Sequence, residues 1–170
     1  MTTDEFWDMI AFAKGRVEGL DDPQCERQAE LLESYLANLA PADIIDFHRI
    51  FRESMQQAND RGLWGAAYII NGGCSVDGFD YFRGWLIAQG RDVFDAAMRD
   101  PDTLADVVDG QQDDYEGEFM LYVGADAYEA KTGVEMPRIV VAHGDIRGED
   151  WTEDTVGQRF PRLAALHRWD

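Results

Sequence analysis

Residues 63–90 read LWGAAYIINGGCSVDGFDYFRGWLIAQG, and this stretch decides the fold. Its first third, residues 63–71, is apolar on nearly every side, which predicts a short helix buried at the centre of the protein. From residue 78 onward, Phe79, Phe82 and Trp85 recur at helical spacing and predict a second helix. The glycines between them permit a sharp reversal of the chain. The stretch therefore predicts two packed helices that are joined by a tight turn.

Helical patterns continue on both sides of this pair. Thr2 and Glu5 have the spacing of a capping box at the start of a helix, and Pro41 suits the first position of another. The only β-like run is MPRIVVA at residues 136–142. We therefore expect one all-α domain over residues 1–170. It would be an irregular bundle of six to eight helices with short connections and at most one minor extended segment near residues 136–142.

The composition restricts the classes of partner. The chain has 170 residues with 15 basic and 34 acidic side chains, a net charge of −19. Such a surface repels phosphates, so binding to nucleic acid or to an anionic membrane surface is not expected. No secretory signal or membrane-length apolar stretch is visible, and the two cysteines lie far apart. These features predict a cytoplasmic protein with reduced thiols.

Several motifs together resemble an uncharacterised family of bacterial domains of unknown function. The core of the resemblance runs from Ile70 to Gly90, in the pattern INGG-S-DGF-FR-WLI-QG, after a Glu5-Phe6-Trp7 opening. The tail adds Trp151 to Asp154 and Pro161-Arg162-Leu163. The resemblance implies no established activity and no catalytic residue. Relatives often have an acidic residue where this chain has Val76, which weakens a two-carboxylate site at that position.

The Gly-rich turn suggests a ligand site. Free backbone N–H groups and a following helix N-terminus attract anions, and Arg83 offers a positive charge. The predicted ligand-binding set is Asn71, Gly72, Gly73, Ser75, Asp77, Asp80 and Arg83. The alternative is mechanical, because the glycines reverse the chain and Ser75 or Asp77 caps the next helix. Both roles are compatible with one another.

A second candidate is the acidic run between Asp100 and Ala130, which no Lys or Arg interrupts. Its members are Asp100, Asp102, Asp106, Asp109, Asp113, Asp114, Glu116, Glu118, Asp126 and Glu129. The run fits a docking face for a basic partner, a calcium site, or a solvated acidic loop. The EF-hand order fails, because counting from Asp109 the sixth position is Asp114, where a glycine is required.

The remaining reactive residues form no recognisable set. His48, His143 and His167 do not have the spacing of zinc ligands. His143 lies near Asp145 and suits a general base if a cleft forms there, or else an ordinary surface turn. Cys74 suits an activated thiol at a helix N-terminus, or else a small buried side chain. We therefore expect no metal and no cofactor.

Two hypotheses for the function follow. The first is an interaction module that binds a basic protein partner or a small ligand. The alternative is an enzyme or ligand-binding protein with its site around residues 71–83. Convergence of Asp77, Asp80 and Arg83 in a pocket favours the alternative, whereas an Asp80–Arg83 pair along one helix face reduces the site to an ion pair.

Overall fold

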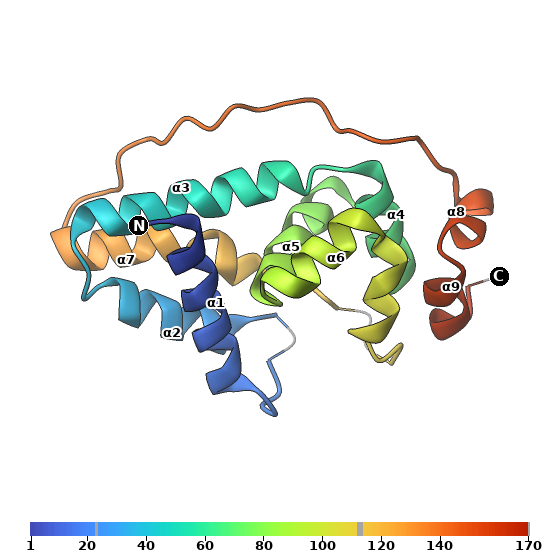
Figure 1. Ribbon diagram of the computed structural model, residues 1–170, viewed down its shortest axis with the longest axis horizontal. Helices are drawn as coiled ribbons and strands as arrows, with labels where there is room; N and C mark the ends of the chain where they lie inside the picture. The colour runs from blue at the N-terminus through green and yellow to red at the C-terminus, as the bar shows by residue number, and fades with distance from the viewer. Residues whose placement is uncertain (23, 112–113, 170) are drawn as a thin grey trace.

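The computed structural model describes residues 1–22, 24–111 and 114–169, and it is an all-α irregular bundle (Figure 1). The α-helices are α1 (Thr3–Val17), α2 (Glu26–Leu36), α3 (Pro41–Gln57), α4 (Arg61–Ile70), α5 (Val76–Ala88), α6 (Arg91–Arg99), α7 (Val123–Thr132), α8 (Glu153–Arg159) and α9 (Pro161–His167). Two 3₁₀ helices, η1 (Pro101–Asp106) and η2 (Glu118–Leu121), lie between α6 and α7. The predicted all-α irregular bundle is confirmed, but the described residues form nine α-helices, more than the six to eight that the sequence predicts.

The predicted pair α4 and α5 forms the centre of the core. On α4 the buried side chains include Leu63, Ile69 and Ile70, and on α5 they include Phe82 and Leu86. Their burial removes apolar surface from water, which is the main stabilising contribution to folding. Trp85 is also buried, whereas Trp64 and Tyr68 lie half-buried at the edge of the core. This edge position leaves their rings available to line a pocket.

Residues 114–117 return the chain to α5 through a close backbone contact. Gly117 donates a backbone hydrogen bond to the carbonyl of Tyr81 (2.8 Å). A Cβ on Gly84 would lie 2.5 Å from the Gly117 oxygen, so neither position has room for a side chain. The two glycines let η2 pack directly on α5. This packing fixes the middle of the acidic run beside α5.

A long connection, residues 133–152, joins α7 to α8, and we call it the strap. Figure 1 shows it in orange, passing along α3 to the opposite end of the molecule. The strap is extended, as expected near residues 136–142, and its one β-bridge joins Arg147 to Asp60. Arg147 N donates to the Asn59 carbonyl (3.2 Å), and Arg61 N donates to the Arg147 carbonyl (2.8 Å). The strap is therefore attached at the start of α4, and it is longer than the short connections that the sequence predicts.

The last two helices pack on α4 and η1. Gly65 of α4 allows this, because a Cβ there would lie 3.0–3.1 Å from Phe160, Trp151 and Val156. Asp102 of η1 is buried, and its carboxylate accepts hydrogen bonds from the backbone of Arg162 (3.1 Å) and Leu163 (3.0 Å) at the start of α9. None of the described helices combines the length and the apolar character needed to cross a membrane.

Candidate functional site

The Gly-rich turn has the geometry of a connection between two capped helices. Gly72 and Gly73 have φ values of 63° and 132°, which favour glycine. Gly73 N donates to the Tyr68 carbonyl (2.8 Å) and closes the end of α4. The Ser75 hydroxyl accepts from Gly78 N (3.0 Å) and caps the start of α5. The turn geometry and the helix cap therefore explain why Gly72, Gly73 and Ser75 occur here without a ligand.

The predicted site residues fall into two groups. At the turn, Asn71 exchanges hydrogen bonds with the backbone of Tyr115: its Oδ1 accepts from Tyr115 N at 3.1 Å, and its amide donates to the Tyr115 carbonyl at 3.5 Å. Gly72, Gly73, Ser75 and the exposed Asp77 lie at this same end of α5. Asp80 and Arg83 form the second group, on the part of α5 that faces α3.

Arg83 fastens α5 to α3. Its side chain is only 11% exposed, donates to the Met55 carbonyl (2.8 Å) and forms an ion pair with Asp80. The guanidinium also lies over the Phe79 ring, 4.7 Å from its centre. Burial lowers the pKa of Arg83, and Asp80 raises it. This pair is the i, i+3 pair that the sequence allows, and its contacts are those of a structural clamp.

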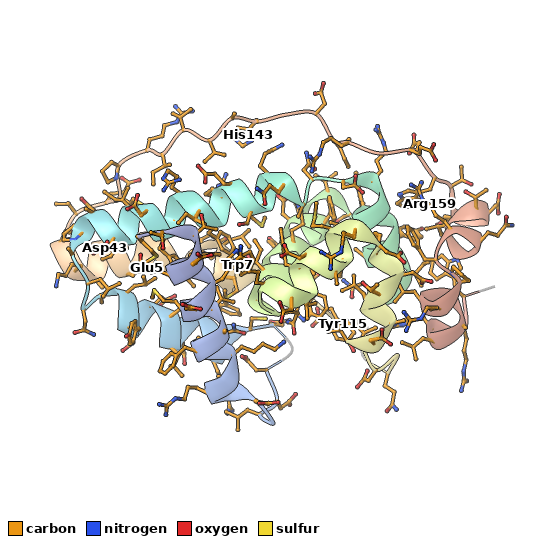
Figure 2. The ribbon with its side chains drawn as sticks, viewed as in Figure 1. Glu5, Trp7, Asp43, Tyr115, His143 and Arg159 are labelled. Atoms are coloured by element: carbon orange, nitrogen blue, oxygen red, sulfur yellow. The ribbon has the colours of Figure 1, made fainter. Side chains whose placement is uncertain are left out.

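Asp80 and Arg83 line a small hollow of about 270 Å³, together with Arg52 of α3 and the exposed His143 of the strap. Asp77 does not line it. Figure 2 shows His143 on the strap at the top of the view, and on the lower side it shows Tyr115, whose backbone N–H donates to Asn71 of the Gly-rich turn.

Part of the acidic run has partners inside the protein. Asp102 binds the start of α9, Asp106 forms an ion pair with Arg162, and Asp109 accepts from the Tyr115 hydroxyl (2.9 Å). Asp113 lies outside the described residues. Among the described residues, no cluster of three or more potential ligands has a geometry that could hold a metal ion.

Three further carboxylates of the run lie close to the Gly-rich turn and its Asp77. We call the exposed or half-buried Asp77, Asp114, Glu116 and Glu118 the acidic face. Burial raises the pKa of Glu116, and Asp114 and Glu118 raise it further. Glu118, with Asp77, likewise raises the pKa of the Tyr81 hydroxyl. These shifts show that like charges lie close enough to repel one another.

Apolar side chains accompany the acidic face. Val76, at the first position of α5, is 65% exposed, and Phe119 and Tyr122, in or beside η2, are 38% and 49% exposed. Exposed apolar side chains next to one type of charge are typical of binding surfaces. The acidic face thus combines carboxylates with apolar contact area.

A second feature, the aromatic pocket, lies between α4, the Gly-rich turn and the strap. It has a volume of about 380 Å³ and is lined by Arg61, Trp64, Tyr68, Cys74, Ile146, Asp150 and Trp151. The Tyr68 and Trp151 rings lie 5.1 Å apart at 53°, so they form two walls that meet at an angle. Trp64 forms a further wall and stacks on Phe79 at 5.3 Å.

Cys74 connects the aromatic pocket with the acidic face. A Cβ on Gly78 would lie 3.5 Å from the Glu116 carboxylate and 3.7 Å from the Cys74 sulfur, so these groups are near neighbours. Burial raises the pKa of Cys74 to about 12, and Glu116 adds to this effect. The thiol is therefore protonated at neutral pH and is a poor nucleophile.

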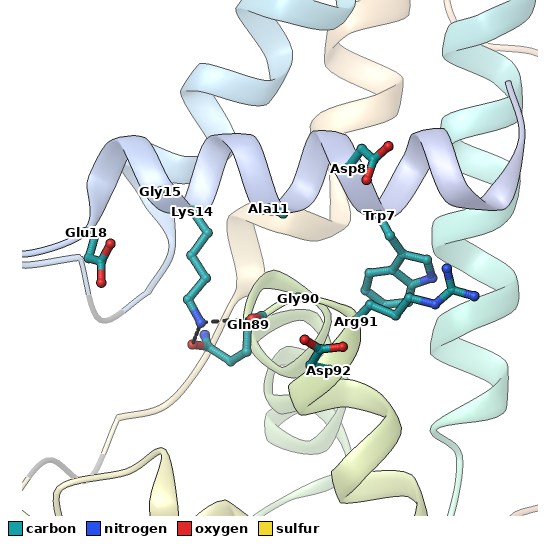
Figure 3. Close-up of a pocket in the computed structure, with 10 residues that line it drawn as sticks. All are labelled: Trp7, Asp8, Ala11, Lys14, Gly15, Glu18, Gln89, Gly90, Arg91 and Asp92. Carbon is teal, nitrogen blue, oxygen red and sulfur yellow. Dashed lines mark hydrogen bonds between the residues drawn. The ribbon is translucent and has the colours of Figure 1, made fainter.

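A larger hollow of about 450 Å³ lies between α1 and the end of α5 (Figure 3). Lys14 reaches across it and donates to the Gln89 backbone carbonyl (2.8 Å) and to the Gln89 side-chain oxygen (3.1 Å). Burial lowers the pKa of Lys14. Asp8, Glu18 and Asp92 also line this hollow, so it offers charges of both signs. The lysine bonds fasten α1 to α5.

Sequence reasoning did not identify the aromatic pocket. The apolar pattern of residues 63–71 predicts Trp64 and Tyr68 in the core, and the sequence places Trp151 only in a motif near the C-terminus. Trp151 lies 87 positions after Trp64 and 83 positions after Tyr68 in the sequence, and the strap brings it to α4. The Trp151 indole donates a hydrogen bond to the Arg61 carbonyl (2.7 Å). An aromatic residue beside Asp150 in a polar stretch is the one signal that points to such a role.

Comparison with known proteins identifies a family but no activity. No curated protein and no solved structure matches the chain. A family model matches residues 1–130, a range that contains α1 to the greater part of α7 and the motif from Ile70 to Gly90, while most of the strap and the last two helices lie beyond it. The match covers most of the sequence. The chain therefore belongs to the family described as Protein of unknown function (DUF4240).

Proposed function

We propose that this protein is a binding module whose acidic face docks a basic segment of a partner protein, in the bacterial cytoplasm that the sequence predicts. One observation carries the proposal. Among the described residues, the four carboxylates of the acidic face form no ion pair with Lys or Arg, although other surface carboxylates do. A basic partner would relieve the repulsion between Asp114, Glu116 and Glu118.

The apolar side chains describe the partner further. Val76, Phe119 and Tyr122 offer contact area that a purely electrostatic surface would not need. A basic amphipathic segment places cationic side chains on the carboxylates and apolar side chains between them. In this proposal Asp77 belongs to the acidic face itself, and the turn residues Asn71, Gly72, Gly73 and Ser75 hold that face in position, because Asn71 fixes Tyr115 beside α5.

The alternative of an enzyme or small-ligand site around residues 71–83 has less support. Arg83 forms an ion pair with Asp80 and donates a hydrogen bond to the Met55 carbonyl, on the part of α5 that faces α3. Both side chains therefore already have partners within the protein. The Cys74 thiol has a raised pKa, which disfavours nucleophilic catalysis. A docking surface, in contrast, needs only the exposed carboxylates of the acidic face in their observed positions.

The test uses decalysine as a probe of the basic segment, with binding measured by isothermal titration calorimetry at about 50 mM salt, where electrostatic binding is weakly screened. The variant Asp77→Asn/Glu116→Gln/Glu118→Gln should bind at least about tenfold more weakly than the wild type. The control Asp8→Asn/Glu18→Gln/Asp92→Asn removes the same charge from the exposed surface of α1 and α6. It should change the affinity by less than about threefold. Equal weakening in both variants would show only a non-specific response to net charge and would refute the proposal.

A further inference from the structure

We infer that the aromatic pocket receives the ammonium group of a lysine side chain. This inference rests on the proposed function for the source of the lysine, which is the basic segment docked on the acidic face. Cations bind over the faces of Trp and Tyr, because the ring quadrupole places negative charge there. The aromatic pocket offers three such rings from two separate segments of the chain.

The polar atoms of these rings are already occupied. Trp64 Nε1 donates to the Cys74 carbonyl (3.0 Å), and Trp151 Nε1 donates to the Arg61 carbonyl (2.7 Å). The Tyr68 hydroxyl donates to the Glu153 carboxylate. These bonds fix the rings in place and leave ring surface, rather than N–H or O–H donors, for a ligand. A hydrogen-bond acceptor therefore finds no aromatic donor in the pocket.

The charges around the aromatic pocket also favour a cation. Asp150 lines it, Glu153 binds one of its aromatic walls, and Glu116 acts on the pKa of its Cys74. Among the described residues that line it, Arg61 is the one basic side chain, and it pairs with Asp150 at 3.5 Å. The carboxylates exceed the single guanidinium, so an anionic ligand is disfavoured.

The position of the aromatic pocket suits a side chain from the proposed partner. The Cys74 sulfur and the Glu116 carboxylate both lie next to Gly78, so the acidic face and the pocket adjoin at the Gly-rich turn. The Cys74 thiol is neutral and adds a small, weakly polar wall. A lysine that projects from a segment on the acidic face could extend past the turn into the aromatic pocket.

The first experiment compares choline with 3,3-dimethylbutan-1-ol, which has the same shape without the charge. Binding is followed through the indole N–H signals of the wild type in NMR titrations. Choline should shift the signals of Trp64 and Trp151 but not those of the buried Trp7 and Trp85, and it should bind at least about fivefold more tightly than the alcohol. Equal binding of both probes would show a merely apolar pocket, and no shift at Trp64 and Trp151 would show that the pocket does not take a cation. Either result would overturn the inference.

Variants of Tyr68 supply a matched pair, because this side chain is half-buried and neither change should prevent folding. Tyr68→Phe keeps the ring and should bind choline within about threefold of the wild type. Tyr68→Leu removes the ring and should weaken binding at least about fivefold. If both variants bind alike, the ring face does not contribute and the inference fails.

A decalysine titration of the same NMR sample separates the inference from the proposed function. If the peptide binds and shifts Trp64 and Trp151, both stand. If it binds through the acidic face without shifting these indoles, the proposed function stands and the inference fails. If it does not bind while choline still shifts both indoles, the proposed function fails, and the assignment of the cation to a partner lysine fails with it.

Discussion

At the scale of single residues, glycines decide how closely α5 and the segment before η2 approach. Gly84 lies against the backbone of Gly117, and the contact carries the Gly117–Tyr81 hydrogen bond. Backbone atoms cannot move aside as a flexible side chain can. The acidic face depends on this contact, because it holds Glu116 and Glu118 beside α5.

Replacing Gly84 with alanine should therefore lower the free energy of unfolding by about 1–3 kcal/mol, since the new Cβ meets a backbone oxygen. Gly15→Ala is the matched control, because it lies in a helix with no atom within 4 Å of its added Cβ. It should raise stability by about 0.5–1 kcal/mol through the higher helix propensity of alanine. Urea unfolding measures both changes, and a neutral Gly84→Ala would contradict the tight contact.

At the scale of elements, η1 attaches the C-terminal helices to the rest of the molecule. Asp102 is buried and accepts two backbone hydrogen bonds from the first turn of α9. These are N–H groups that the helix cannot satisfy within itself. The neighbouring Asp106 reaches Arg162 as well, but both side chains of that pair are at least half exposed.

Asp102→Ala should lower the free energy of unfolding by about 1–3 kcal/mol, because it leaves buried backbone donors without an acceptor. Faster hydrogen exchange at the amides of Arg162 and Leu163 should accompany the loss. Asp106→Ala breaks only an exposed ion pair and should cost less than about 1 kcal/mol. If the two variants lost equal stability, the buried carboxylate would not be the main attachment of α9.

At the scale of the whole molecule, the net charge of −19 sets the electrostatic balance. The ion pairs among the described residues lie mostly at exposed side chains, where each contributes little. Repulsion between the remaining carboxylates opposes the compact state. Salt screens this repulsion over distances beyond the Debye length, which is about 10 Å at 0.1 M.

Raising NaCl from about 10 mM to about 300 mM should therefore raise the melting temperature, by about 2–4 °C if screening recovers about 1 kcal/mol. Differential scanning calorimetry at pH 7 measures the shift. KCl should act equally, because screening depends on ionic strength rather than on the identity of the cation. A lower melting temperature in salt would mean that attractive ion pairs outweigh the repulsion.

The candidate surfaces differ in how far sequence reasoning could reach them. The Gly-rich turn and the acidic run were both visible as local patterns, and the caps at Ser75 and the positive φ of Gly72 follow from local chemistry. The sequence does not show that the turn and the acidic run lie side by side, because the Asn71–Tyr115 bonds that join them connect positions 44 residues apart. From the sequence, Asp102 is expected to be a surface carboxylate, but the packing of α9 against η1 buries it.

The helical fold, the central α4–α5 pair and the negative charge of the chain all follow from local sequence patterns and composition. Helical periodicity, capping residues and glycine conformations act within a few residues, and charge is a sum over the chain. Long-range packing, in contrast, sets which carboxylates form contacts within the protein and brings Trp151 of the strap against Tyr68. These contacts depend on how distant elements pack together, and no local pattern encodes that packing.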